Sequence, residues 1–181
     1  LSILTMFVGN LSALSQVTFK RLLAYSSITH VGYALLTIIS KDVASQSNLL
    51  FYLFAYGFSV LALITVAMLI NDKEDKIEGF KGLAKRNPFL GLVSILALLS
   101  LAGVPPLVGF FGKYLVFAGA ISDYPVLVII ALLNSGIGIY YYLKTVMTIV
   151  SKEDVSTEAI EVTKLQYFVL AICTIGLIAG G

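Results

Sequence analysis

Charged residues are scarce in this sequence. Of its 181 residues, 12% are Asp, Glu, Lys or Arg and 59% are hydrophobic, and the mean hydropathy is +0.97. This composition excludes a soluble domain and is typical of a protein with several membrane-spanning helices. The formal net charge of +2 gives no reason to expect a nucleic acid as a partner.

Cysteine and histidine occur once each, as Cys173 and His30. A single cysteine cannot form an internal disulfide, and the sequence has no CxxC motif or Cys/His cluster that could hold a metal ion or an iron–sulfur centre. We therefore expect no cofactor on this chain, whether metal, nucleotide or flavin. Cys173 is expected to be an inert packing residue.

The sequence begins at Leu1, inside an apolar stretch, and ends at Gly180-Gly181. No basic segment or cleavage site precedes the first apolar stretch, so no signal peptide is expected. Both ends look like cuts through a longer membrane domain, or through a subunit that is divided between two chains.

Six apolar runs predict an all-α, polytopic bundle of about six transmembrane spans. A span needs about 20 residues, so the first and last runs are short. The runs are Leu1–Leu14, Phe19–Ser40, Leu49–Ile70, Leu92–Ile121, Pro125–Val150 and Leu165–Gly181.

The fourth run is too long for one straight helix and contains its own break. As a continuous helix its 30 residues would measure roughly 45 Å, against a hydrocarbon core of roughly 30 Å. Gly103, Pro105 and Pro106 stand in its middle and do not favour helix, so two half-helices joined by an unwound turn are predicted. Unwound backbone at membrane depth is tolerated only inside protein or beside a hydrated cavity, where transporters place ion paths.

Basic residues are predicted to gather on one side of the membrane. If the first run leads from side one to side two, only Lys41 falls in a loop on side one. Basic loops stay on the side of insertion, so side two is predicted to face the bacterial cytoplasm or the mitochondrial matrix. The basic residues on side two are Lys20, Arg21, Lys73, Lys76, Lys81, Lys85, Arg86, Lys144, Lys152 and Lys164.

Two polar connectors lie on side two. In residues 71–87, Ile77, Phe80 and Leu83 recur at a spacing of three, which suggests either a short helix on the membrane surface or a solvated connector. In residues 152–164, the following helix is expected to be capped by Ser151 or Ser156.

Two stretches resemble a known family. VTFKRLLAYSSITHVGYALL, residues 17–36, and SLAGVPPLVGFFGKYLVFAGAI, residues 100–121, closely resemble the signature helices of the antiporter-like, proton-pumping membrane subunits of respiratory complex I. The HVGY ending, the GFFGK segment and IGIYYYLKTV, residues 137–146, look most like subunit N, called subunit 2 in mitochondria. The resemblance covers nearly the whole chain.

The resemblance implies a fold of two inverted five-helix repeats, each with one broken helix. Residues 1–150 would form the second repeat, and residues 151–181 an inner-side loop and closing helix. The hinge of the broken helix would comprise Gly103, Pro105, Pro106 and Gly109. Partners would be the missing N-terminal half, other membrane-arm subunits and lipid. NADH, FMN, iron–sulfur clusters and quinone would act in other subunits.

Three residues are candidates for proton transfer. Lys113 matches the family's lysine on the second broken helix; burial disfavours its ammonium form, although it could instead snorkel to the surface. His30 lies near mid-depth of its helix and can both donate and accept a proton, or it could only hydrogen-bond Ser26, Ser27 or Thr29. Lys20 also matches a family lysine, but with Arg21 it could equally be a topological anchor.

Further polar side chains could line the path. Lys144 follows Tyr140, Tyr141 and Tyr142, and an interfacial aromatic belt with a snorkelling lysine explains these four equally well. Tyr33, Tyr52, Tyr56 and Tyr114 could hydrogen-bond water or could only pack between helices. Asn134 and Ser135 are candidate contacts to the broken helix.

The sequence thus favours a proton-translocating membrane subunit of NADH:quinone oxidoreductase, an enzyme complex in which this chain carries no redox site. One alternative is a subunit of a multisubunit cation/proton antiporter, which would share the broken helix and its lysine. Another is a non-conducting membrane scaffold. A ferredoxin-dependent photosynthetic relative of complex I is a further alternative.

Overall fold

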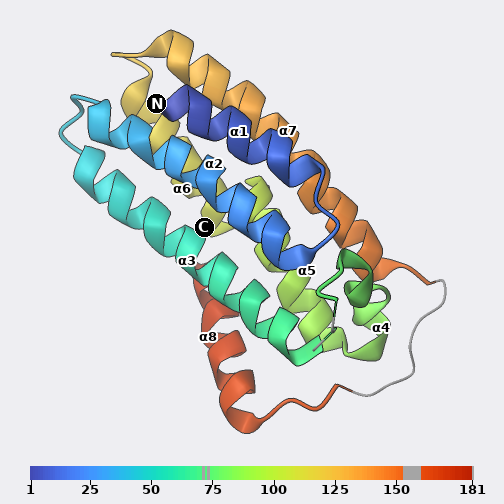
Figure 1. Ribbon diagram of the computed structural model, residues 1–181. Coiled ribbons are helices and arrows are strands. Elements are labelled where there is room, and N and C mark those ends of the chain that lie inside the picture. The colour runs from blue at the N-terminus through green and yellow to red at the C-terminus, as the bar shows by residue number, and fades with distance from the viewer. Residues whose placement is uncertain (71, 73, 153–159, 181) are drawn as a thin grey trace.

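The computed structural model describes residues 1–70, 72, 74–152 and 160–180, and in these residues the regular structure is entirely helical (Figure 1). The elements are α1 (Ser2–Leu14), α2 (Phe19–Ile39), α3 (Ser45–Ile70), the 3₁₀ turn η1 (Ile77–Phe80), α4 (Leu83–Arg86), α5 (Pro88–Ala102), α6 (Val108–Ala120), α7 (Pro125–Val150) and α8 (Lys164–Ala179). The predicted all-α fold is confirmed.

The helices run lengthwise between two ends of the molecule (Figure 1). At the first end, the α2–α3 turn meets the α6–α7 turn: Ser40 Oγ donates to the carbonyl of Gly119 at 2.7 Å, and the amide of Lys41 donates to Asp123 at 2.8 Å. At the second end, the amide of Ile77 donates to the carbonyl of Val17 at 3.0 Å. Successive spans therefore alternate in direction.

Each predicted apolar run contains a helix, and two helices begin four residues earlier than predicted, while α8 begins one residue earlier, at Lys164. The third helix starts at Ser45 rather than Leu49. The fifth starts at Pro88 rather than Leu92, because the Asn87 side chain accepts from the amide of Leu90 and proline fits the first helical turn. In the described part of the chain, α2, α3 and α7 are long and apolar enough to cross a membrane.

The predicted break separates α5 from α6. Gly103 caps α5 in the left-handed conformation, with φ of 83°, and its amide donates to the carbonyls of Leu99 and Ser100. The Pro105-Pro106 bond is cis, and α6 begins at Val108. Both half-helices pack along α3, so together they form one discontinuous span.

The connector before α5 contains two short helical segments, η1 and α4, at the second end of the bundle, as the spacing of its apolar residues suggested; Asn71 and Lys73 lie outside the described residues. Phe80 and Leu83 are buried in the end of the bundle. The rings of Phe80 and Phe19 are 4.2 Å apart between centroids. The segment folds back over the second end because these apolar side chains pack against α2 and α7.

The helix α8 is capped by Thr163 rather than Ser151, because Thr163 and Gln166 form a reciprocal capping box. Ser156, the other predicted cap, lies outside the described residues. Gly176 brings α8 against the ring of Phe58 on α3, and Cys173 is buried in the same packing, as predicted.

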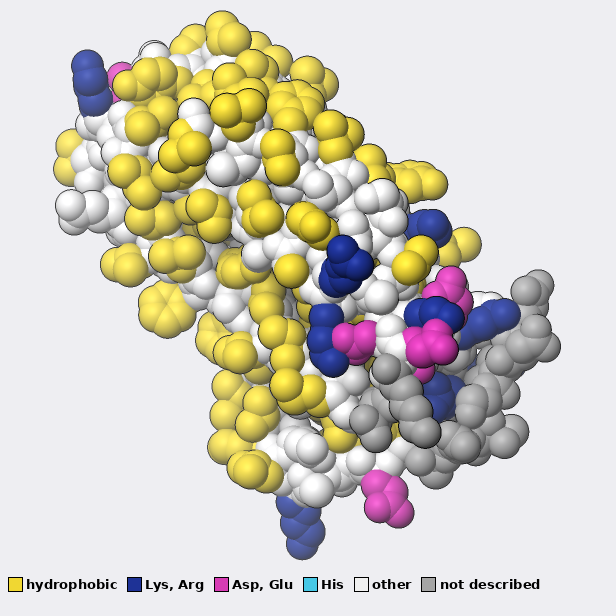
Figure 2. Space-filling view, in the orientation of Figure 1, with side chains coloured by type: hydrophobic (Ala, Val, Ile, Leu, Met, Phe, Trp, Pro, Cys, Tyr) yellow, Lys and Arg dark blue, Asp and Glu magenta, His cyan; other side chains and the backbone are white. Residues whose placement is uncertain are grey.

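Charged side chains occupy the two ends. Figure 2 shows hydrophobic side chains over most of the visible face and charged ones mainly at its lower end. Lys41 lies at the first end, whereas Lys20, Lys76, Lys85 and Arg86 lie at the second, as the six-span prediction requires. All described acidic residues fall outside the long helices.

Candidate functional site

Lys113 is buried at the break in the discontinuous span. Lys113 is only 6% exposed, so a charged side chain lies inside a bundle of mostly apolar helices. Its Nζ donates to Ser135 Oγ at 2.9 Å and to the carbonyl of Ala102 at 3.2 Å. Since the side chain points back toward the end of α5, it does not snorkel to the surface.

The break itself provides the setting for this ammonium group. Ala102 is the last residue of α5, and a helix C-terminal carbonyl carries partial negative charge. A neutral hydroxyl on α7 supplies the second acceptor. Neither partner is a carboxylate, so the proton on Lys113 is not held by a strong ion pair.

Two glycines make this geometry possible. A Cβ on Gly103 would lie 3.1 Å from Lys113 Cδ and 3.4 Å from Nζ, in addition to requiring a left-handed conformation. A Cβ on Gly109 would overlap the backbone carbonyl of Ser100, whose hydroxyl accepts from the Gly109 amide at 3.1 Å. Gly103 and Gly109 therefore let the two half-helices meet closely around the lysine chain.

His30 lies between two tyrosines from neighbouring helices. Its Nδ1 is 2.6 Å from the hydroxyl oxygen of Tyr52, and its Nε2 is 3.3 Å from that of Tyr142. The other residues predicted to hydrogen-bond His30 bond elsewhere. Ser26 and Ser27 donate to carbonyls of their own helix, and Thr29 donates to a carbonyl of α1. Both ring nitrogens of His30 thus face groups that can exchange protons.

A small cavity joins His30 to Lys113. Its volume is about 10 Å³, close to the smallest that holds one water molecule. Besides these two residues, Tyr52, Ser59, Ser100 and Gly109 line it. The two candidate proton carriers therefore line the same small cavity beside the break.

A second polar cluster, which the sequence did not predict, is centred on Asn10. Asn10 Nδ2 donates to the backbone carbonyl of Asn134 at 2.7 Å and also to its side-chain oxygen. Asn10 Oδ1 accepts from Tyr141 at 2.8 Å and from Thr29 at 3.2 Å. Asn10 and Asn134 are fully buried, so this cluster joins α1, α2 and α7 inside the apolar bundle.

Tyr33 connects the two clusters. Its ring lies under the Lys113 ammonium, 5.5 Å from Nζ to centroid, and its hydroxyl is close to Ser135 and Asn10. The rings of Tyr141 and Tyr142 pack against each other with centroids 4.5 Å apart. Because Tyr141 bonds to Asn10 and Tyr142 faces His30, this ring contact places the Asn10 cluster next to His30. Polar side chains thus lie beside one another in a buried series. Its members are Lys113, Ser135, Tyr33, Asn10, Tyr141, Tyr142, His30 and Tyr52.

This series leaves out Lys20, Lys144, Tyr114 and Asn134, which were predicted as site residues, and Asn134 bonds instead to Asn10 beside the series. The Lys20 side chain is 58% exposed and forms an ion pair with Asp75 at 2.8 Å at the second end, which fits an anchor. Lys144 is exposed on the outer side of α7. Tyr114, 59% exposed, faces outward because it follows Lys113 by one residue and so points about 100° away around the helix.

The prediction of one aromatic belt for residues 140–142 is wrong for two of its three tyrosines. Tyr140 is exposed, but Tyr141 and Tyr142 are buried. Thr145, one helical turn after Tyr141, is buried too, whereas Lys144 faces outward with Tyr140. The rotation of α7 about its axis therefore places residues that are neighbours in the sequence on two different faces of the helix, one buried and one exposed.

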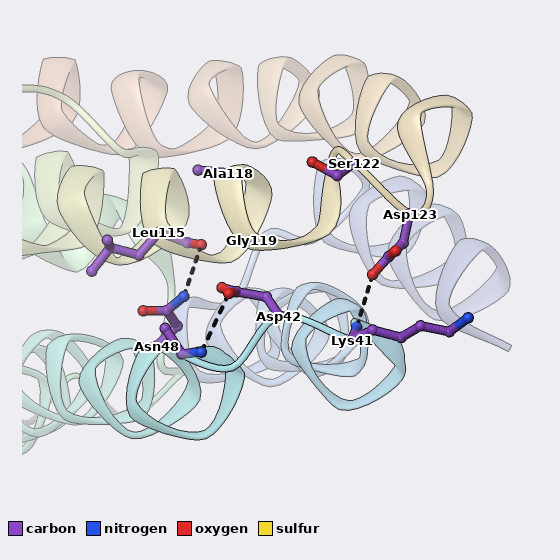
Figure 3. Close-up of a pocket in the computed structure, with 9 residues that line it drawn as sticks. Lys41, Asp42, Asn48, Leu115, Ala118, Gly119, Ser122 and Asp123 are labelled. Atoms are coloured by element: carbon purple, nitrogen blue, oxygen red, sulfur yellow. Dashed lines mark hydrogen bonds between the residues drawn. The ribbon is translucent and has the colours of Figure 1, made fainter.

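A polar cavity opens at the first end, where the α2–α3 and α6–α7 turns meet (Figure 3). Its volume is about 500 Å³. Asp42 and Asp123 accept from backbone amides there, and Asn48 Nδ2 donates to the carbonyl of Leu115 at 3.4 Å. Gly119 of α6 lines this cavity, less than two helical turns after Lys113.

Residues 1–138 match a family described as "NADH:quinone oxidoreductase/Mrp antiporter, TM". The chain belongs to this family. The NADH:quinone oxidoreductase/Mrp antiporter family is a membrane family, and with the apolar spans described above the match makes the chain an integral membrane protein.

Curated relatives within the family are longer than this chain. NADH-quinone oxidoreductase subunit N of Bdellovibrio bacteriovorus is 37% identical, over 99% of this chain and 40% of the relative. Subunit N of Cytophaga hutchinsonii is 42% identical, over 87% of this chain and 35% of the relative. The chain spans roughly two fifths of the length of these relatives.

A chain in the structure of respiratory complex I from Thermus thermophilus with bound aureothin has the same fold. It superposes with a TM-score of 0.88 at 35% identity, over 99% of this chain and 41% of that chain. The fold predicted for an antiporter-like membrane subunit is therefore confirmed.

Proposed function

We propose that this chain is part of a proton-translocating membrane subunit of an NADH:quinone oxidoreductase, the second antiporter-like repeat followed by a closing helix. The observation that carries the proposal is Lys113, a buried ammonium held at the helix break by a hydroxyl and a helix-end carbonyl. The names of the curated relatives and the match to a complex I chain support it.

The buried series suggests how a proton would move. His30 can accept on one ring nitrogen and donate from the other, so it passes a proton between the tyrosine hydroxyls and the small cavity beside Lys113. Lys113 takes the proton and releases it toward the first end, where the polar cavity at Asp42 and Asp123 opens. The uncharged amide of Asn10 accepts from Tyr141 and is itself held by Asn134.

Coupling to electron transfer would come from elsewhere. NADH, FMN, iron–sulfur clusters and quinone would bind to other subunits of the complex, with the N-terminal half of the subunit and other membrane-arm subunits as partners. Because the basic loops lie at the second end, that end would face the bacterial cytoplasm or the mitochondrial matrix. Protons would then leave at the first end.

A cation/proton antiporter subunit is the second candidate, because the family description includes the Mrp antiporter. Lys113 and its break would serve either assembly. The driving force differs: an antiporter exchanges Na⁺ or K⁺ for protons without NADH.

The test uses the complete complex reconstituted in liposomes, with NADH and quinone supplied. We expect Lys113→Ala to reduce NADH-driven lumen acidification at least about tenfold relative to electron transfer. Lys144→Ala, on the exposed face of α7, is the matched control and should change neither rate. A scaffold role predicts unchanged acidification in both variants. Acidification driven by a Na⁺ or K⁺ gradient without NADH would favour the antiporter.

A further inference from the structure

A crevice opens beside Lys113 between α6 and α7. Its volume is about 480 Å³, within the range of about 300–1,000 Å³ of small-molecule sites. Most of its wall is apolar, and its lining includes exposed residues such as Tyr114 and Leu132, so it opens to the outer surface of the described helices. Its apolar wall includes Phe110, Phe117, Ile121, Leu132 and Ile139.

The floor of the crevice is polar and cationic. Lys113 and Ser135 line it, with Gly103 beside them. Among the described residues that line it there is no Asp or Glu. An ammonium has three N–H donors, and the contacts of Lys113 to Ser135 and Ala102 use two of them. The crevice therefore offers a hydrogen-bond donor and a positive charge beneath an apolar wall.

We propose that this crevice binds a long-chain fatty acid from the bilayer, with its carboxylate at Lys113 and Ser135 and its chain along Phe117 and Leu132. A carboxylate supplies both the counter-charge and the acceptor that the floor lacks. A single acyl chain matches the apolar wall, whereas a diacyl phospholipid would bring a second chain and a bulky headgroup into the same space.

Binding would place an anion on the residue that we assign to proton transfer. The occupied site would hold the Lys113 proton in an ion pair and slow its release. This inhibitory consequence rests on the proposed function, but the binding itself does not. A binding measurement therefore separates failure of the site from failure of the proposed function.

Gly136 provides a variant that fills the crevice without disturbing packing. It lines the crevice, and a Cβ there meets no atom within 4 Å. Gly57 on α3 is equally open but lies outside the crevice, so it is the matched control. We expect Gly136→Leu to block the site and Gly57→Leu to leave it free.

The experiment labels the complete complex in nanodiscs with a palmitate probe that carries a photoreactive diazirine on its chain. Peptide mapping should find label on α6 and α7, reduced at least about fivefold by excess oleate, by Gly136→Leu or by Lys113→Ala, and unchanged by Gly57→Leu. A normal amount of assembled complex on a native gel for Gly136→Leu would establish that the complex is intact.

Four outcomes would overturn the proposal. Equal labelling by the methyl ester of the probe would show that the carboxylate is not recognised. Equal labelling by a photoreactive phospholipid would assign the crevice to bulk lipid. Labelling that persists in Gly136→Leu would place the probe elsewhere. No label on α6 or α7 would mean that a neighbouring subunit covers the crevice.

Discussion

Lysine occupies two contrasting regions of this molecule. At the break between α5 and α6, Lys113 is enclosed by helices and held by uncharged acceptors. At the second end, Lys20 and Lys76 are exposed and pair with Asp75 and Glu74. The same side chain is thus an isolated buried cation in one region and half of a solvated ion pair in the other.

The difference shows what allows a charge to serve in proton exchange. An exposed ion pair is weakened by water and salt and contributes at most about 1 kcal/mol. A buried ammonium loses hydration, and neutral acceptors replace only part of it. At the break, the free carbonyl of Ala102 provides an acceptor for such a group.

The largest effect is expected from closing the break. Gly109→Ala places a Cβ against the backbone carbonyl of Ser100, which cannot move without separating α5 from α6. We expect a loss of about 3 kcal/mol in stability, measured as a strongly lowered thermal unfolding temperature in detergent. Gly136→Ala, whose Cβ meets no neighbour, is the control. Equal unfolding temperatures for both variants would refute the close contact at Gly109.

A smaller loss is expected from the uncharged polar cluster. Asn10→Leu removes the acceptor of the Tyr141 hydroxyl and the donor to the side-chain oxygen of Asn134 in an apolar interior. Unpaired buried groups should cost about 2 kcal/mol, measured by the same thermal unfolding. Asn48→Leu, at the polar cavity of the first end, should cost less because its long 3.4 Å bond lies near solvent. The reverse order would contradict the assignment of Asn10 to the core network.

His30→Phe should affect transport more than stability. Phenylalanine keeps the ring contacts to Tyr56 and Tyr33 but removes both polar contacts, to Tyr52 and Tyr142. We expect NADH-driven acidification to fall about tenfold, equivalent to about 1.4 kcal/mol of barrier, in an assembled complex. A His30→Phe complex that acidifies the lumen at the normal rate would remove His30 from the path.

The smallest effect on stability is expected from a substitution at the second end of the molecule. Lys20→Ala breaks an exposed ion pair with Asp75, so stability should fall by less than about 1 kcal/mol and acidification should stay unchanged. The remaining effect should vanish at high salt, which thermal unfolding at two ionic strengths would show. A loss of acidification as large as that of Lys113→Ala would restore Lys20 to the candidate proton carriers and end the contrast between the two regions.

Much of this arrangement is local chemistry, which explains why it could be predicted. Apolar runs indicate spans because a bilayer excludes unpaired polar groups, and Gly103, Pro105 and Pro106 break a helix in almost any surroundings. The alternation of basic loops then gives the order of crossings. Lys113 follows as the one lysine within a predicted span and close to its break.

The partners of these residues could not be predicted, because they depend on how each helix is rotated and tilted against its neighbours. The sequence around Asn10 is an apolar run and does not indicate a polar cluster. The sequence IYYYLK suggests an interfacial aromatic belt, but the rotation of α7 about its axis buries Tyr141 and Tyr142. In the connector at residues 74–87, the burial of Phe80 likewise depends on its contact with Phe19 of α2.

By itself, the sequence determined the membrane class, the number and order of the spans, the break and the lysine beside it, because hydropathy and backbone freedom are properties of short segments. Tertiary structure alone decided that Lys113 binds the end of α5, that His30 lies between Tyr52 and Tyr142, and that Lys144 and Tyr114 face outward. Those outcomes depend on contacts between residues 11 to 112 positions apart, which only the packing of whole helices can bring together.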